Sequence, residues 1–90
     1  MMSSREGWPE WWHFELVFSP HALERMQERG LGEVKLRTLL QDAQDYRPSC
    51  VPGRFLVSSS MGGDHWEVIV EPDELEGVLI VVTAYGVQSR

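Results

Sequence analysis

The first part of the chain alternates apolar and polar positions and then changes to a helical period. His13 to Phe18 reads as a strand, with Phe14, Leu16 and Phe18 on one face. Ser19 and Pro20 suit the N-cap and the first position of a helix, because proline loses no hydrogen bond there. The pattern predicts a helix that runs to about Arg29 and is ended by Gly30.

A second helix is predicted from about Glu33 to Gln44. Its apolar positions fall on one side of the helix, which predicts a core face made of Leu36, Leu39, Leu40 and Ala43. On the first helix the same argument predicts a buried face of Ala22, Leu23 and Met26. Tyr46 to Gly53 contains Pro48 and Pro52 and is predicted to be a loop.

The second half of the chain has the period of extended structure. Strands are predicted at Arg54–Ser59, His65–Val70 and Val78–Tyr85, with a hairpin turn at Met61–Asp64 and another turn at Pro72–Gly77. The last strand is apolar almost throughout and rich in β-branched residues. It is therefore expected to lie centrally in the sheet and to be covered on both faces.

These elements predict an α+β domain with the order β-α-α-β-β-β. The last three strands should form an antiparallel meander, and two helices should pack on one face of a mainly antiparallel four-stranded sheet. Residues 1–12 precede the first strand and are interpreted as an aromatic arm, and residues 13–90 as one domain.

Composition narrows the class of protein. Hydrophobic residues make up 42% of the 90 residues and charged residues 24%, which argues against a disordered or coiled-coil chain. The longest apolar run, Val78–Val82, is too short to span a membrane, and the start of the sequence lacks a signal peptide, so we expect a cytoplasmic protein. The single cysteine, Cys50, excludes an internal disulfide, and no metal-ligand spacing or cofactor motif is present, so no metal or cofactor is expected.

The charge is acidic, with 8 Lys and Arg against 14 Asp and Glu and a formal net charge of −6. Such a chain repels polyphosphate at long range, which disfavours broad non-specific nucleic-acid binding. Because all the basic residues except Lys35 are arginine, a local site for phosphate or carboxylate remains possible.

Three basic side chains line up along the first predicted helix. At about 100° per residue, Arg25 lies about 40° and Arg29 about 80° from His21, beside the apolar face. A stripe at the border of a buried face is partly desolvated, where a cation holds an anion more strongly than in open water. The alternative is structural, because Arg25 and Glu28 have ion-pair spacing and Arg29 suits the C-terminal end of a helix.

Three further polar residues lie at strand ends, and these are Arg54, His65 and Tyr85. In an antiparallel meander the start of one strand lies beside the end of its neighbour, so Tyr85 is expected near His65. For the same reason Arg54 and His65 are expected at opposite ends of the sheet. His65 suits proton transfer, although a polar residue beside a hairpin also needs no function.

The predicted arm contains Trp8, Trp11 and Trp12. Either this cluster folds back over a sheet face or edge, or it is an exposed aromatic patch that anchors a partner.

The stretch Phe18–Leu31 resembles the opening motif F-S-x-H-A-x-x-R-M-x-E-R-G-I/L of a small bacterial family of unknown function. That family continues with a Gly-Arg strand start, here Gly53-Arg54, and a valine-rich strand that ends in tyrosine, here Tyr85. The order of elements is in turn similar to RelE- and BrnT-like toxins of toxin–antitoxin pairs, which are small RNA-cleaving proteins. The resemblance implies that the matching polar positions form a site: His21, Arg25, Arg29, Arg54 and Tyr85.

Two functions are therefore expected as alternatives. The first is a RelE-like toxin that cleaves RNA without metal, with His21 or His65 moving protons and Arg25, Arg29 and Arg54 holding the phosphate. Its partners would be an antitoxin protein and an RNA substrate. The second is a non-catalytic interaction domain that binds a protein through the tryptophan arm or an open strand edge, and the net charge favours it.

Overall fold

The fold combines short helices with a sheet in which the first and last strands of the chain are neighbours. A computed structural model describes residues 7–87. In chain order the elements are a short 3-10 helix η1 (Glu10–His13), β1 (Glu15–Phe18), α1 (Pro20–Glu28), α2 (Glu33–Gln41), β2 (Asp45–Pro48), β3 (Phe55–Met61), β4 (Asp64–Asp73) and β5 (Val78–Val87). The α+β class and the predicted order of helices and principal strands are confirmed.

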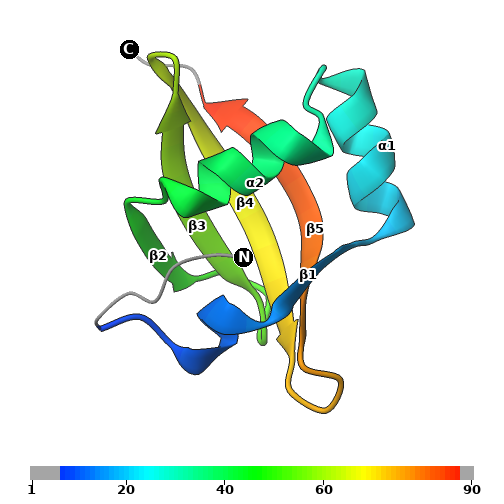
Figure 1. Cartoon of the computed structure of the whole chain (residues 1–90), viewed down its shortest axis with the longest axis vertical. Helices are drawn as coiled ribbons and strands as arrows, with labels where there is room; N and C mark the ends of the chain where they lie inside the picture. The colour runs from blue at the N-terminus through cyan, green and yellow to red at the C-terminus, as the bar shows by residue number, and fades with distance from the viewer. Residues whose placement is uncertain (1–6, 88–90) are drawn as a thin grey trace.

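The sheet is mixed and has the strand order β1-β5-β4-β3-β2 (Figure 1). The predicted antiparallel meander is present as β3, β4 and β5. β1 adds to the other side of β5 in parallel, so β5 lies centrally as predicted. Within residues 7–87 the sheet has five strands, so the prediction of four strands was wrong.

The additional strand, β2, lies in the stretch that was predicted to be a loop. Tyr46 pairs with Val57 and Pro48 with Phe55, and β2 forms one edge of the sheet. Proline is tolerated in an edge strand where its nitrogen faces away from the neighbouring strand. The two prolines therefore marked an edge strand and the turn after it, rather than a continuous loop.

The helix boundaries follow the predicted caps. The Ser19 Oγ accepts a hydrogen bond from the Ala22 N–H at 3.0 Å, and Gly30 follows α1 with a φ of 67°. α2 ends at Gln41, three residues before the predicted end. β1 begins at Glu15 instead of His13, because His13 completes η1.

Two tight turns connect the strands of the meander. Gly62 and Gly63 join β3 to β4 as predicted. Their φ values are 60° and 89°, a conformation that residues with a side chain rarely adopt. The second turn begins later than predicted, because β4 continues to Asp73. The Asp73 Oδ1 then accepts hydrogen bonds from the backbone N–H groups of Leu75 and Glu76, each at 3.1 Å.

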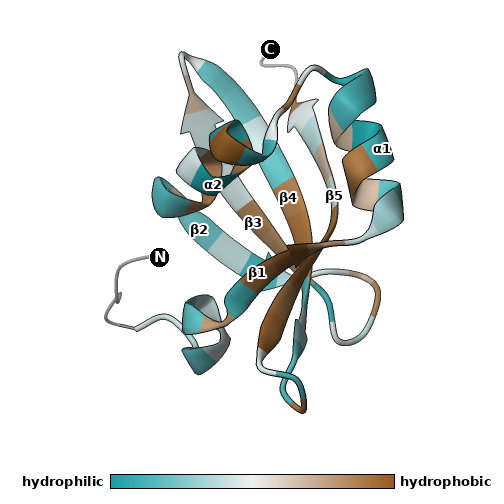
Figure 2. Ribbon diagram, turned by 45° about the vertical axis from the view of Figure 1, so that its right-hand side comes forward, coloured by the Kyte–Doolittle hydropathy of each residue, from teal (hydrophilic) through white to brown (hydrophobic). Residues whose placement is uncertain are grey.

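Both helices cover the same face of the sheet, as predicted (Figure 1). Figure 2 shows apolar segments in both helices and in the central strands. The predicted core face of α2 is buried throughout, whereas Leu23 of α1 is 43% exposed and was wrongly placed in the core. The sheet contributes mainly Val57, Val68, Val70, Leu79, Val81 and Ala84 to the core.

The opposite face of the sheet is only partly buried. We call it the uncovered face, and its central side chains are Arg47, Leu56, Ser58, His65, Glu67, Ile69, Glu71, Ile80, Thr83 and Tyr85. The apolar run of β5 was expected to be covered on both faces, and this was wrong. Leu79 and Val81 are fully buried, whereas Ile80 and Tyr85 on the other side are half-buried.

The described part of the predicted arm packs against the domain. Trp11 is 9% exposed and Trp12 1%. The rings of Trp8 and Trp12 lie 4.5 Å apart between centroids, and Trp11 lies 4.9 Å from Phe55. The first alternative for the tryptophans, folding back over the sheet, is therefore correct. Residues 1–6 of the predicted arm and 88–90 lie outside the described residues.

No helix within residues 7–87 is long and apolar enough to cross a membrane.

Candidate functional site

The α1 stripe of His21, Arg25 and Arg29 does not form an open cationic pocket. His21 is exposed in the first turn of α1. The Arg25 Nη1 forms an ion pair with the Glu28 Oε1 at 2.9 Å, on a part of the helix where both side chains are about half exposed. Arg29 donates from Nη1 to the backbone carbonyl of Ala84 at 2.8 Å. Both arginines of the stripe are thus engaged within the protein.

The other predicted site residues, Arg54, His65 and Tyr85, lie on the uncovered face. The Arg54 Nε donates to the Glu71 Oε1 at 2.9 Å across the β3–β4 pair. His65 is half-buried near the β3–β4 turn and pairs with Val87. It is six residues from Glu71 along β4, or about 20 Å at ~3.4 Å per residue. Arg54 and His65 therefore lie at opposite ends of the face, as expected.

The two groups of predicted residues are not brought together. The α1 residues lie on the helix-covered side, whereas the side chains of Arg54, His65 and Tyr85 lie on the uncovered face. Among the described residues, no hydrogen bond or ion pair joins side chains of the two groups. The expected gathering of Arg25, Arg29 and Arg54 around one phosphate is therefore corrected, and the reason is that the sheet separates them.

The uncovered face instead carries a cluster of Arg47, Glu67 and Tyr85, of which the sequence predicted Tyr85 as a site residue but missed Arg47 and Glu67. The Tyr85 hydroxyl donates to the Glu67 Oε1 at 2.8 Å, and the Arg47 Nη2 lies 3.8 Å from the Glu67 Oε2. The pairing register explains this arrangement, because Tyr85 pairs directly with Glu67. His65 precedes Glu67 by two residues and so lies on the same face of β4.

The Glu67 carboxylate is more buried than the arginine beside it. Its side chain is 17% exposed, against 57% for Arg47, so the carboxylate is partly desolvated while its cationic neighbour remains in contact with water. Burial raises the pKa of the Tyr85 phenol above 10.0, and the hydrogen bond and negative charge of Glu67 raise it further. Tyr85 is therefore neutral near pH 7 and remains a hydrogen-bond donor to Glu67.

Two signals in the sequence bear on this cluster. The hairpin at Gly62 and Gly63 fixes the pairing of β3 with β4 and so places Glu67 beside Ser58. Together with the alternation from His65 to Ile69, that register indicates Glu67 as a polar group of the uncovered face. Arg47 gave no such signal, because its strand was interpreted as a loop.

The predicted partner-binding residues, Trp8, Trp11 and Trp12, belong to the core side. Trp11 and Trp12 are buried and Trp8 is half-buried against Tyr46, with ring centroids 4.7 Å apart. A buried ring offers no surface to a partner. The expectation that these tryptophans form an exposed patch that anchors a partner was therefore wrong.

The edge formed by β2 offers few backbone donors to an added strand. Ser49 N–H donates to the Arg54 carbonyl at 2.9 Å, so by alternation the odd-numbered residues of β2 face β3 and the even-numbered ones face outward. The outward N–H of Tyr46 is bonded to the Asp45 Oδ1 at 2.8 Å, and Pro48 has none. This edge is protected against strand addition.

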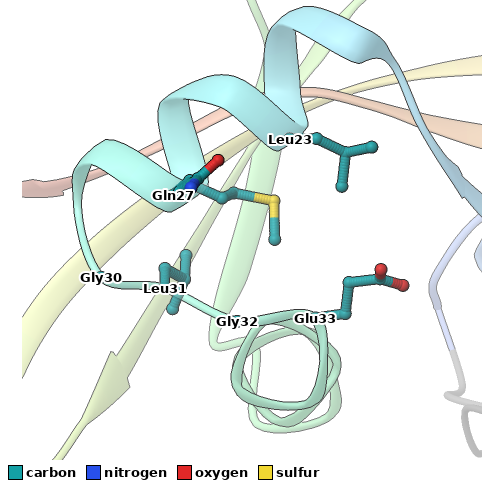
Figure 3. Close-up of a pocket in the computed structure, with 7 residues that line it drawn as sticks. Leu23, Gln27, Gly30, Leu31, Gly32 and Glu33 are labelled. Atoms are coloured by element: carbon teal, nitrogen blue, oxygen red, sulfur yellow. The ribbon is translucent and has the colours of Figure 1, made fainter.

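A shallow groove of about 390 Å³ lies between α1 and the start of α2 (Figure 3). Leu23 and Glu33 approach it from the two helices, and Leu31 lies between them. It contains none of the predicted catalytic residues. Within residues 7–87 no group of three His, Cys, Asp or Glu side chains is arranged to hold a metal ion.

The comparisons with known proteins agree with the fold. The structure of this chain, a mixed five-stranded sheet with two helices on one face, is similar to that of the Brucella abortus ribonuclease toxin BrnT. The TM-score is 0.66, the match covers 84% of this chain and 99% of that chain, and the sequences are 16% identical. The class defined by the fold is therefore a BrnT-like α+β domain. Residues 18–86 match the family described as "Domain of unknown function (DUF4258)", and the chain belongs to this family. No curated protein matches the sequence.

Proposed function

We propose that this chain is the toxin of a toxin–antitoxin pair and cleaves RNA on the uncovered face without a metal ion. The single observation that supports this most is the cluster of Arg47, Glu67 and Tyr85, with His65 beside it. Metal-free cleavage of RNA needs a base, an acid and a cation on one surface, and these side chains supply all three. The similarity of the fold to a ribonuclease toxin supports the same reaction class.

The chemistry assigns a role to each side chain. The Glu67 carboxylate accepts the proton of the ribose 2′-hydroxyl, and the 2′-oxygen attacks the adjacent phosphorus. Arg47 stabilises the negative charge that develops on the phosphoryl oxygens. The bond from phosphorus to the 5′-oxygen breaks, and His65 donates the proton that the leaving oxygen needs. The products are a 2′,3′-cyclic phosphate and a 5′-hydroxyl.

The hydrogen bond from Tyr85 orients the Glu67 carboxylate. It occupies Oε1 and leaves Oε2, which faces Arg47, for the substrate. Contacts with a neutral donor on one side and an arginine on the other restrict the rotation of the Glu67 carboxylate, and a fixed orientation favours a general base.

The decisive experiment is cleavage of an end-labelled synthetic RNA by the purified chain, with and without EDTA. We expect EDTA to have no effect and Glu67→Gln to reduce the rate about 100-fold or more, as loss of a general base does. Glu71→Gln is the matched control, because Glu71 lies on the same face and also pairs with an arginine. It should retain activity within a factor of about three, as should His21→Ala.

A second function, a protein-interaction domain without catalysis, is favoured by a different observation. Arg25 and Arg54 are each paired with a carboxylate, and the chain has a net charge of −6, so free positive charge for RNA is scarce. If the wild-type chain cleaves no RNA and expression is not toxic, this second function replaces the first. If Glu67→Gln cleaves as fast as the wild type, the uncovered face is not the catalytic site.

A further inference from the structure

β5 loses one of its two neighbours halfway along its length. β1 pairs only with Val78–Val81, whereas β4 pairs with β5 as far as Val87. The C-terminal half of β5 therefore has a strand on one side only. A strand end of this kind has unpaired backbone groups, and it frays unless another part of the protein satisfies them.

A bulge in β5 determines which backbone groups face this open side. Ile69 pairs with Thr83 but Val70 pairs with Val81, so Val82 is the extra residue. Before the bulge the Val81 carbonyl accepts a hydrogen bond from the Ser19 N–H at 3.2 Å. After the bulge it is the Ala84 carbonyl that faces the same side. In an unbroken strand, carbonyls that face the same side are an even number of residues apart. Because of the bulge, the Val81 and Ala84 carbonyls are three residues apart.

Arg29 occupies the place that a further strand would take. Arg29 is the C-cap residue of α1, and its Nη1 donates to the Ala84 carbonyl at 2.8 Å. Tyr85 follows Ala84 directly and donates to Glu67 on the other face. One residue of β5 is thus held from α1, and the next residue contacts the candidate catalytic carboxylate.

We propose that Arg29 is a positioning residue for the cluster of Arg47, Glu67 and Tyr85. By binding the Ala84 carbonyl it holds the second half of β5 against β4 and so keeps Tyr85 opposite Glu67. The consequence for RNA cleavage rests on the proposed function, whereas the positioning of Tyr85 does not.

The other basic side chains of α1 do not replace Arg29. Arg25 lies one turn earlier and is paired with Glu28 at 2.9 Å, and His21 lies at the far end of the helix. Among the described residues, Arg29 makes the side-chain hydrogen bond that joins α1 to β5. This assigns the third member of the α1 stripe a role in aligning β5 rather than in holding phosphate.

The test measures the pKa of Tyr85 by titration. It uses a Tyr46→Phe background, because the chain has 2 tyrosines and Tyr85 is then the one that remains. The pKa of Tyr85 is raised by burial and by Glu67, and both effects require Tyr85 to stay against β4. In Arg29→Gln we expect the pKa of Tyr85 to move down toward its ordinary value of about 10. Arg29→Lys keeps a cationic donor and should restore most of the shift, and Arg25→Gln, one turn away, should leave it unchanged.

Amide hydrogen exchange provides a second readout at neutral pH. In Arg29→Gln, exchange in β5 after Val82 should accelerate about tenfold or more, whereas exchange of Val78–Val81 should stay within a factor of about three. If neither the titration of Tyr85 nor this exchange changes, the proposal is overturned. Loss of RNA cleavage in Arg29→Gln without either change would also overturn it, since Arg29 would then act on the substrate itself.

The two proposals fail in different ways. If Arg29→Gln lowers the pKa of Tyr85 but the wild-type chain cleaves no RNA, the positioning role stands and the proposed function is rejected. The other outcome is that the wild type cleaves RNA and that Arg29→Gln lowers kcat with little change in KM. If Arg29→Gln also lowers the pKa of Tyr85, the positioning role and the proposed function are both supported.

Discussion

Tyr85 and Glu67 lie 18 residues apart in the sequence, and their side chains meet at 2.8 Å across the β4–β5 pair. The contact joins the last strand of the fold to the most buried carboxylate among the ion pairs of the described chain. A single hydrogen bond thus reports both the register of the sheet and the integrity of the candidate site.

Replacing Tyr85 with Phe should destabilise the protein by about 1–2 kcal/mol, because Glu67 loses its donor while staying partly desolvated. Urea denaturation followed by tryptophan fluorescence measures this difference. Tyr46→Phe is the matched control, since it removes a hydroxyl from the other tyrosine, and it should cost less than Tyr85→Phe. Equal effects of the two substitutions would show that the bond to Glu67 contributes no stability.

The same tyrosine makes stability depend on alkaline pH. The pKa of Tyr85 is raised in the folded state, so the unfolded chain ionises first, at about pH 10. Between that value and the higher folded pKa, the unfolded state binds fewer protons, and the free energy of unfolding decreases as the pH rises. Below about pH 9 this contribution should be constant.

Unfolding midpoints at several pH values between about 9 and 11 test this dependence. The wild type should lose more stability over this range than Tyr85→Phe, because all other titrating groups are common to both proteins. Parallel decreases in the two proteins would contradict a raised pKa of Tyr85.

The sequence predicted those parts of the fold that short-range chemistry determines. Ser19, Pro20 and Gly30 define α1 through capping and backbone preference, and the glycine pair at residues 62–63 defines a hairpin. β2 was missed because its four residues become a strand only through pairing with β3. Leu23 was misplaced because its position on the helix wheel does not reveal how far α1 lies from α2.

The candidate site was harder to predict for a related reason. The pair Arg25–Glu28 could be foreseen from its spacing, whereas Arg54–Glu71 spans 17 residues and requires the register of β3 on β4. Tyr85 meets Glu67 only because Val82 is bulged, and no residue type marks that bulge. Chemistry that depends on pairing between distant strands is visible only once the register is known.

Trp12 should be the residue of the N-terminal segment on which stability depends most. It is 1% exposed and packs on Trp8 and Trp11, so Trp12→Ala should cost about 3–5 kcal/mol. Leu75→Ala serves as the control, because Leu75 is 98% exposed and its loss should change stability by less than about 0.5 kcal/mol. Chemical denaturation measures both. A small effect of Trp12→Ala would mean that the segment does not belong to the cooperative core.

The ion pair between Arg25 and Glu28 should contribute almost nothing to stability. Both side chains are about half exposed to water, where an i,i+3 pair is worth less than about 0.5 kcal/mol. A double-mutant cycle of Arg25→Ala and Glu28→Ala, measured by thermal unfolding at low and high salt, should give a coupling energy in that range. Because we expect Arg25→Ala to leave the fold intact, its activity is informative. If it cleaves RNA like the wild type, Arg25 does not hold the phosphate. If it is stable but inactive, the phosphate is bound at α1 and the assignment to the uncovered face is wrong.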